Sequence, residues 1–275
     1  MARPIALVTG ASRGIGKAAA IALADAGFDV AVAARTLTEG AGRDDSKPDG
    51  VALPGGLDTT AAAVEAAGGR ALPVVIDLLE TDTLLAAVAR VEADWGPIDV
   101  LVNNAVHTGP GSMTRFLDTT PEDFEKKAQA NYLSQLVLIR AVLPGMIDRG
   151  RGRIINMTSA AGMQDPTAPV GEGGWGLAYS ASKAAFHRTA GILAVEHGPD
   201  GVLAFNVEPG MVLTEKMAIN QRVLGLEDKY PVAPPSVPAS VVVWLATSDG
   251  AAAHNGETFN AQRFARERAL HPDWR

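Results

Sequence analysis

Tyr179 and Lys183 stand four residues apart in the segment Y-S-A-S-K and could together carry acid–base chemistry. Residues four apart on a helix lie on one face, so the two side chains would be neighbours. A free phenol has a pKa of about 10, and an ammonium about 4 Å away, at an effective dielectric of about 20, contributes about 4 kcal/mol. The lysine would thus lower the pKa of Tyr179 by about three units. The pair predicts a general acid or base that works near neutral pH.

A glycine-rich loop near the start of the chain, V-T-G-A-S-R-G-I-G-K, is the second candidate site. Its glycines, Gly10, Gly14 and Gly16, fit neither G-x-G-x-x-G nor a Walker A loop, and Ala18 replaces the Ser or Thr that would hold magnesium. We therefore exclude a P-loop NTPase. The loop follows an apolar run and opens a helical pattern, so a pyrophosphate could approach the N–H groups at the helix N-terminus. The alternative is a tight turn without a ligand.

The elements that must position these residues alternate along the chain. The expected strands are residues 5–10, 29–35, 73–78, 99–105, 152–160 and 201–210. The expected helices are residues 17–27, 57–67, 83–95, 121–146, 179–197 and 236–247. Apolar strands without polar alternation, each followed by a helix, predict a parallel sheet covered on both faces. The fold class is therefore α/β: a doubly wound, Rossmann-type sheet.

No internal repeat or boundary divides the chain, so residues 1–275 are expected to form a single dinucleotide-binding domain. Residues 38–56 and 164–176 are interpreted as insertions rich in glycine and proline. We expect no regular element in residues 38–56. Loops of this length in a compact domain are often functional.

Composition excludes several classes of protein. The chain has 24 basic and 31 acidic residues, a net charge of −7, which disfavours a nucleic-acid partner. It has no cysteine, and no histidine pair has the spacing of a helical metal site, so we expect no metal. The N-terminus lacks the apolar run of a signal peptide. The apolar segment 133–147 is interrupted by Arg140 and Pro144 and is expected to be too short to span a membrane. These observations predict a cytoplasmic protein.

Five motifs, in order and in register, resemble those of the short-chain dehydrogenase/reductase family. They are T-G-A-S-R-G-I-G at residues 9–16, N-N-A at 103–105, N-M-T-S-A-A-G at 156–162, Y-S-A-S-K at 179–183 and P-G at 209–210. The resemblance covers about residues 5–214. It implies an oxidoreductase that transfers a hydride between a nicotinamide cofactor and a small secondary alcohol or carbonyl substrate.

The resemblance also implies roles for four catalytic residues. Tyr179 would exchange the proton, Lys183 would assist it and hold the nicotinamide ribose, and Ser159 would bond the substrate oxygen. Asn131 matches the asparagine that helps to hold a proton-relay water. The gap of twenty residues between Ser159 and Tyr179 is longer than the family usually has, so Thr158 and Ser180 remain alternatives to Ser159.

We expect NADP(H) to be preferred over NAD(H). An NAD enzyme carries a carboxylate at the end of the second strand, where this chain has Ala34 followed by Arg35. Arg35 and Arg13 could bind a 2′-phosphate, although the insertion could bring in Asp44 or Asp45. The cofactor contacts implied by the resemblance are Gly10, Ser12, Arg13, Gly14, Ile15, Gly16, Arg35, Asp77, Leu78, Asn103, Ala105, Tyr179, Lys183, Pro209, Gly210, Val212 and Thr214.

Substrate contacts are expected at His107, Met163, Trp175 and Met211. For His107 a neutral loop histidine is the favoured interpretation, and Trp175 could equally lie on a surface excursion. In the family, residues 211–235 would form the variable substrate loop, and Met211, Met217, Leu224 and Leu226 predict an apolar pocket.

Two other functions remain as alternatives. A non-catalytic dinucleotide sensor or scaffold could use the same fold. A sugar-nucleotide epimerase or dehydratase also uses a Tyr/Lys pair, but resembles longer chains with a C-terminal sugar-binding domain. By resemblance, residues 121–146 and 179–197 would pair two chains in a homodimer or homotetramer.

Overall fold

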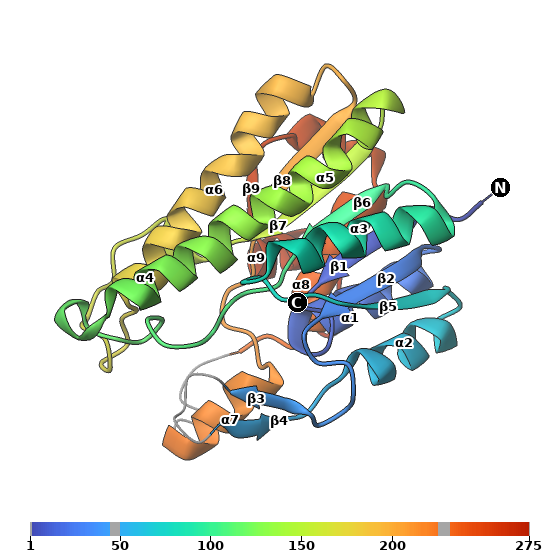
Figure 1. Ribbon diagram of the computed structural model, residues 1–275. Helices are drawn as coiled ribbons and strands as arrows, with labels where there is room; N and C mark the ends of the chain where they lie inside the picture. The colour runs from blue at the N-terminus through green and yellow to red at the C-terminus, as the bar shows by residue number, and fades with distance from the viewer. Residues whose placement is uncertain (1, 45–49, 225–231, 275) are drawn as a thin grey trace.

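Within residues 2–44, 50–224 and 232–274, which the computed structural model describes, seven strands form one central sheet (Figure 1). They are β1 (Ile5–Thr9), β2 (Asp29–Ala34), β5 (Ala71–Val75), β6 (Val100–Asn103), β7 (Gly152–Met157), β8 (Val202–Glu208) and β9 (Thr258–Asn260). Their order is β5-β2-β1-β6-β7-β8-β9, and every neighbouring pair is parallel. The predicted doubly wound parallel sheet is confirmed.

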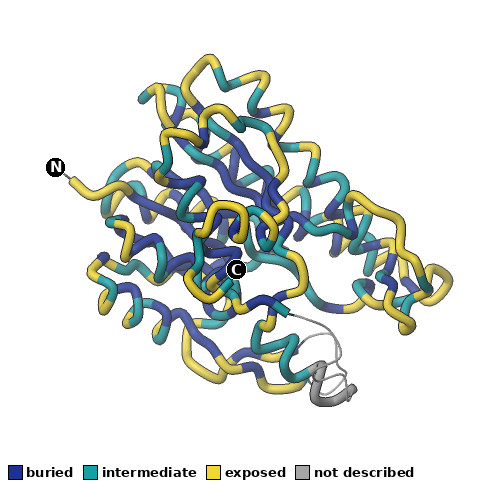
Figure 2. Tube along the Cα trace, turned by 180° about the vertical axis from the view of Figure 1, so that it is seen from behind, coloured by how far each residue is buried: buried dark blue, intermediate teal, exposed yellow. Residues whose placement is uncertain are grey.

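Helices cover both faces of this sheet. Their bounds are α1 (Gly14–Asp25), α2 (Leu57–Ala66), α3 (Thr81–Trp95), α4 (Pro121–Ala128), α5 (Ser134–Asp148), α6 (Leu177–His197), α7 (Glu215–Leu224), α8 (Ser236–Thr247) and α9 (Ala261–Glu267). One apolar cluster joins the sheet to α1, α2, α8 and α9, and a second joins it to α3, α5 and α6. Figure 2 shows the buried strands between the half-exposed helices. Burial on both sides explains why the strand sequences lack polar alternation.

The chain reverses its direction of travel across the sheet between β1 and β6. From β1 it proceeds to β2 and β5, then returns to β6 and continues to β9. In such sheets, ligands bind in the crevice beyond the carboxyl ends of the strands at this reversal. The glycine loop follows β1, and the N-N-A segment begins at the last residue of β6, so both lie at this crevice.

Residues 38–56 contain regular structure, contrary to the prediction. Strand β3 (Gly42–Asp44) pairs antiparallel with β4 (Val51–Leu53), and residues 45–49 lie outside the described residues. A Cβ on Gly42 would lie 2.1 Å from Nη2 of Arg13, so the hairpin packs directly on the glycine loop. Three-residue strands are too short to produce a detectable alternating pattern, which is why composition misled the prediction.

The expected helix 121–146 consists of three parts. Helix α4 leads into a π-helical turn, Gln129–Leu133, which continues as α5 to Asp148. Pro144 lies inside α5 and does not end it, so the helix is continuous where the sequence suggested an interruption. By length and composition alone the 28 residues Pro121–Asp148 would suffice to span a membrane, but they pack beside α3 and α6, and 44% of the most apolar window is buried within the fold.

Candidate active site

The glycine loop is shaped by two residues in the left-handed backbone region. Gly10 has φ of +66° and Gly14 has φ of +56°. A Cβ on Gly10 would lie 2.9 Å from Cα of Ala105, and one on Gly16 would lie 2.3 Å from the Gly10 carbonyl oxygen. Gly16 therefore lets the loop pack closely against its own backbone. The sequence alone could not distinguish this packing role from the role of leaving room for a ligand.

At the N-terminus of α1, no side chain from the start of the helix itself accepts hydrogen bonds from the first backbone N–H groups. Its N-cap residue, Arg13, makes no side-chain cap, and Ser12 before it is buried. The Gly14 N–H donates to Oε2 of Glu215 at 2.9 Å, so a carboxylate from α7 lies where this helix end favours an anion. Glu215 was not predicted as a site residue.

Arg13 and Arg35 lie close enough to interact electrostatically at the end of β2. The Arg13 side chain donates to the carbonyls of Pro54 at 2.8 Å and Gly55 at 3.1 Å. Burial lowers the pKa of Arg13, Glu215 opposes this effect, and Arg35 adds to it. The insertion thus wraps around Arg13, while Arg35 remains exposed.

The insertion carboxylates differ from those considered in the sequence. Asp44 is buried and forms a 2.7 Å ion pair with Lys216 of α7, while Asp45 lies outside the described residues. Instead, Glu39 approaches Arg13 closely enough to affect its pKa. Glu39 accepts hydrogen bonds from the Gly55 N–H at 2.6 Å and the Thr59 hydroxyl at 2.8 Å, and these lower its own pKa.

The N-N-A segment is fixed against the strands beside it. Ala105 donates its N–H to the hydroxyl of Thr9 at 3.0 Å. Asn103, Asn156 and Asn206 occupy paired positions on β6, β7 and β8, and all three are buried. The Asn103 amide donates to the Asn156 side-chain oxygen at 3.0 Å. Asn103 therefore joins neighbouring strands through its side chain.

Asp77 and Leu78 follow β5, and both contribute to the local turn. Asp77 accepts the N–H of Leu79 at 2.9 Å, and the Leu78 carbonyl accepts the hydroxyl of Ser134 at 2.5 Å. Leu78 is buried. The Asp77 carboxylate therefore has a structural partner, whereas contact with an adenine remains a prediction.

The P-G segment is held by the C-terminal part of the chain, for which the sequence suggested no role. Gln262 of α9 donates to the carbonyls of Pro209 at 3.1 Å and Met211 at 2.9 Å. Gly210 has φ of +71° and donates its N–H to Glu208 at 2.7 Å. Val212 and Thr214 continue from this segment to the start of α7, with Val212 buried.

Ser159 and Tyr179 are brought together by β7 and α6. Ser159 lies just after β7, and its side chain hydrogen-bonds that of Tyr179. The two alternative hydroxyls point elsewhere, because Thr158 donates to the Val207 carbonyl and Ser180 to the carbonyls of its own helix turn. Of the three hydroxyls considered, Ser159 is the one that contacts the tyrosine.

The pKa of Tyr179 moves opposite to the expected direction. Burial raises it, the hydrogen bond with Ser159 lowers it, and the carboxylate of Glu208 raises it, with a net increase above the ordinary value. Lys183 lies on the buried face of α6, and its Nζ donates to the Met157 carbonyl at 2.8 Å. Burial lowers the pKa of Lys183 to about 8, and this ammonium does not depress the pKa of Tyr179 as the spacing suggested.

Asn131 lies in the π-helical turn and is 1% exposed. Its side-chain oxygen accepts the His107 N–H at 2.8 Å, and its amide donates to the Ser182 hydroxyl at 3.1 Å. The Ser182 hydroxyl donates in turn to the Tyr179 carbonyl at 2.7 Å. Asn131 thus connects the loop after β6 to the helix that carries Tyr179 and Lys183.

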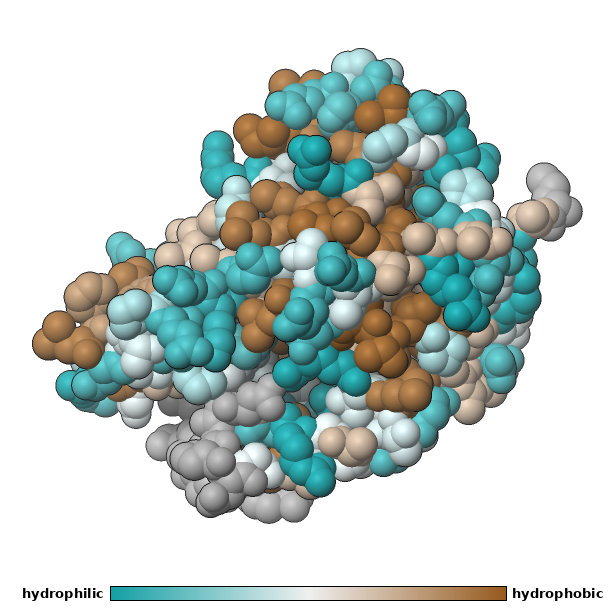
Figure 3. Space-filling view, in the orientation of Figure 1, coloured by the Kyte–Doolittle hydropathy of each residue, from teal (hydrophilic) through white to brown (hydrophobic). Residues whose placement is uncertain are grey.

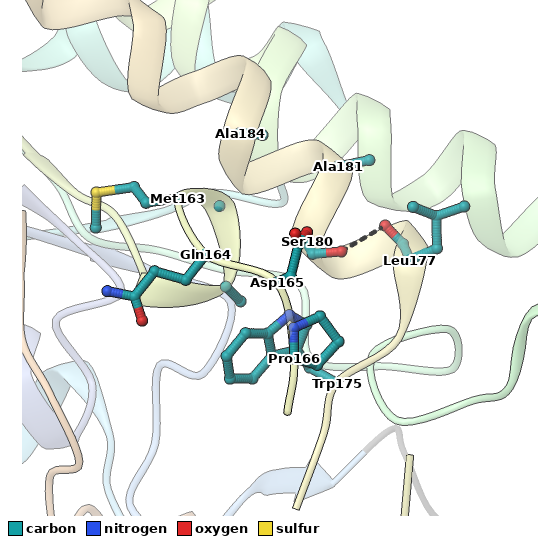
Figure 4. A pocket seen from close by; sticks show the side chains of 11 residues that line it. Met163, Gln164, Asp165, Pro166, Trp175, Leu177, Ser180, Ala181 and Ala184 are labelled. Atoms are coloured by element: carbon teal, nitrogen blue, oxygen red, sulfur yellow. Dashed lines mark hydrogen bonds between the residues drawn. The ribbon is translucent and has the colours of Figure 1, made fainter. Parts of the chain in front are cut away.

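Two predicted substrate residues, Met163 and Trp175, line one cavity of about 470 Å³ between the loop after β7 and the start of α6 (Figure 4). Its walls come from residues 161–166, 175, 177, 180, 181 and 184. Ser159 and Tyr179 precede wall residues but do not line it. The indole N–H of Trp175 is buried without a hydrogen-bond partner in the described part of the chain.

The other predicted substrate residues lie elsewhere. His107 and Met211 are not wall residues of this cavity. His107 uses its backbone N–H for Asn131, and Met211 is 42% exposed beside Gln262. Leu226 falls outside the described residues, as does part of the expected substrate loop, residues 225–231.

The crevice fits a nicotinamide dinucleotide chemically. A phosphate would find the N–H groups of α1 at Ile15 and, in place of the Glu215 carboxylate, at Gly14, with the cations Arg13 and Arg35 nearby. The buried ammonium of Lys183 supplies a donor beside β7. These groups can bind an anionic, hydroxyl-rich ligand next to a tyrosine–serine pair.

Comparison with known proteins agrees with this arrangement. The family described as short chain dehydrogenase matches residues 4–44 and 53–222. An acetoacetyl-CoA reductase of Rhizobium meliloti (strain 1021) is 33% identical over 264 residues, 94% of this chain and 96% of that protein. A short chain dehydrogenase of Pseudocercospora fijiensis (strain CIRAD86) is 35% identical over 215 residues, 76% of this chain but only 60% of the fungal protein.

A solved structure extends the likeness to three dimensions. The crystal structure of a 3-oxoacyl (acyl-carrier-protein) reductase from Agrobacterium tumefaciens C58 with NADP bound has a TM-score of 0.78 and 27% identity, covering 94% of this chain and 93% of that one. The family match includes the glycine loop, Ser159, Tyr179 and Lys183. This chain therefore belongs to the short-chain dehydrogenase/reductase family and is an oxidoreductase.

Proposed function

We propose that the chain transfers a hydride between NADP(H) and a small, largely apolar substrate that carries a carbonyl or secondary alcohol. The observation that carries the proposal is the hydrogen bond between Ser159 and Tyr179 at the crevice, with Lys183 and Asn131 joined to the same two elements. A non-catalytic sensor would not require a serine hydroxyl on the tyrosine.

The raised pKa of Tyr179 suits carbonyl reduction. Because its phenol stays protonated at neutral pH, it can donate a proton to the oxygen of a reduced carbonyl. Ser159 would hydrogen-bond the same oxygen and stabilise its developing charge. The nicotinamide supplies the hydride when bound. Lys183, with a pKa of about 8, is largely protonated at neutral pH and would hold the ribose.

The proposed substrate class rests on the cavity beside α6. Met163, Pro166 and Leu177 give it apolar walls, while the free indole N–H of Trp175 offers one donor. Such a pocket suits an apolar body with a polar oxygen. The relatives named as acetoacetyl-CoA reductase and 3-oxoacyl reductase support a carbonyl substrate.

A cofactor-consumption screen tests the function. NADPH and NADH would each be followed by absorbance with acetoacetyl-CoA and with panels of ketones, aldehydes, quinones and steroids. The proposal expects NADPH oxidation with at least one apolar carbonyl. If neither NADPH nor NADH is consumed with any compound of the panel, and NADPH nevertheless binds tightly, the result would instead favour the non-catalytic dinucleotide sensor.

We expect Glu215→Gln to strengthen NADPH binding. The Glu215 carboxylate accepts the Gly14 N–H, and a cofactor phosphate would need that same donor. Removing one negative charge near the pyrophosphate lowers the dissociation constant by about fivefold, equivalent to about 1 kcal/mol. Fluorescence titration with NADPH measures this, with Glu65→Gln on the exposed surface of α2 as the matched control. Weaker binding by Glu215→Gln would show that Glu215 helps to hold the cofactor.

We further infer a homodimer that forms through the outer face of α5 and α6. Exposed apolar side chains gather over these helices in Figure 3, and Ile192 and Val195 of α6 are 50% and 80% exposed. Large apolar patches on a surface mark interaction sites. Val195→Glu is expected to convert the dimer to single chains, measured by light scattering. Leu85→Glu on α3 is the control, and an unchanged mass for Val195→Glu would contradict this interface.

A further inference from the structure

Lys127, in the last turn of α4, is a buried cation that the proposed chemistry does not use. Its side chain is fully buried, and its Nζ donates to the carbonyls of His107 and Gly109, each at 2.8 Å. No carboxylate among the described residues forms a salt bridge with it, although Asp123 favours its charge. A buried ammonium is costly unless hydrogen bonds compensate it, so these two carbonyls are essential partners.

The loop that Lys127 holds leads directly to the catalytic group. The carbonyl of His107 accepts from Lys127, and the N–H of the same residue donates to Asn131 at 2.8 Å. Asn131 reaches Ser182 at 3.1 Å, and Ser182 reaches the Tyr179 carbonyl at 2.7 Å. A continuous path of hydrogen bonds therefore runs from Lys127 to the backbone of Tyr179.

The packing of this loop makes its position depend on Lys127. A Cβ on Gly111 would lie 3.6 Å from Cε of Lys127 and 3.5 Å from Cβ of Ala178, so the loop fits between α4 and the start of α6. Lys216 reaches the intervening carbonyl of Thr108 at 3.3 Å. Burial, and then Lys216, lower the pKa of Lys127 to about 8, whereas Asp123 raises it.

We propose that Lys127 is a positioning residue for the reaction: by holding the carbonyls of His107 and Gly109, it fixes the His107 N–H on Asn131 and so orients Asn131 toward the Tyr179 helix. Lys127 does not touch the reacting atoms. Its effect on turnover passes through Asn131, which distinguishes it from a residue that only stabilises the fold. The proposal rests on the proposed role of Asn131 in catalysis.

A double-mutant cycle separates positioning from stability. Lys127→Met removes the N–H donors but keeps a side chain of similar length. It is expected to lower kcat by about tenfold to a hundredfold relative to wild type, with the KM for NADPH within about twofold of the wild-type value. In an Asn131→Ala background the same change should cost less than about twofold, because the path is already broken. Lys126→Met, on the exposed side of the same helix, is the matched control. Equal losses in both backgrounds would overturn the proposal.

A second measurement needs no turnover. Hydrogen exchange of the His107 backbone amide, followed by NMR, reports its bond to Asn131. Lys127→Met should accelerate this exchange at least tenfold. The thermal unfolding midpoint of the variant then shows whether the faster exchange is local or reflects a global loss of stability. If Lys127→Met does not fold, Lys127→Gln replaces it in both experiments. Unchanged protection of His107 would overturn the proposal.

Failure of this proposal and failure of the proposed function are distinguishable. A Tyr179→Phe variant with wild-type turnover would contradict the proposed function whatever Lys127 does. If Tyr179→Phe is inactive but Lys127 and Asn131 act additively, the function stands and the positioning role fails.

Discussion

Tyr179→Phe is expected to lower kcat by about 10²–10⁴-fold, the range that a positioned general acid contributes. Phenylalanine keeps the ring that packs in α6 but removes the proton donor. The Ser159 hydroxyl, which hydrogen-bonds Tyr179, cannot replace this donor because a serine hydroxyl is a far weaker acid at neutral pH. Initial rates of NADPH oxidation measure the loss, and fluorescence titration should show an unchanged dissociation constant for NADPH.

Tyr132→Phe provides the matched control. Tyr132 lies in the π-helical turn and packs against the apolar cluster formed with α3, α5 and α6. Tyr132→Phe also removes a phenolic hydroxyl, but one that is not paired with Ser159, so turnover should stay within about twofold of wild type. Should Tyr179→Phe turn over as fast as Tyr132→Phe, proton transfer would have to come from another residue, and the proposed chemistry would be wrong.

The second large effect concerns the choice of cofactor. Arg35→Ala should raise the KM for NADPH by about tenfold to a hundredfold, the equivalent of about 1.5–3 kcal/mol for a charge-assisted hydrogen bond. The KM for NADH, which has no 2′-phosphate, should remain within about twofold. Arg35 is chosen for this test because its side chain is exposed at the end of β2, whereas Arg13 lies under the insertion and holds the carbonyls of Pro54 and Gly55.

Arg43→Ala controls for the loss of a nearby positive charge. Arg43 is exposed on β3 and donates to the carbonyls of Gly40 and Gly42. The ratio of kcat/KM for NADPH to that for NADH is the deciding quantity. A wild-type enzyme that prefers NADH, or an Arg35→Ala variant with an unaltered ratio, would contradict the NADP(H) assignment and point to Glu39 as a ribose-binding carboxylate.

The fold could be predicted because both faces of the sheet are buried. That burial leaves residues 5–8 of β1 and residues 30–34 of β2 as continuous apolar runs, and each strand is followed by a helical period. Short elements were missed for a different reason. Strands β3, β4 and β9 have three residues each, which is too few to show a period, and their stability depends on contacts distant in sequence.

The site could be predicted as far as motifs extend. Spacing on α6 placed Tyr179 and Lys183 on neighbouring turns, but it could not show that the ammonium binds the Met157 carbonyl or that burial dominates the pKa of the phenol. Lys127 and Glu215 were missed because a lone charged residue in a helical pattern is usually solvated. Only the folded chain shows that one is buried and the other caps α1.

The π-helical turn at Gln129–Leu133 makes chain length itself a functional property of this stretch. Such a turn accommodates one residue more than an α-helical turn does, and Asn131 lies within it. Deleting one residue from this stretch would restore regular α-helical winding and remove the widened turn in which Asn131 lies. The position of Asn131 thus depends on the number of residues between Pro121 and Asp148 as well as on which side chains they carry.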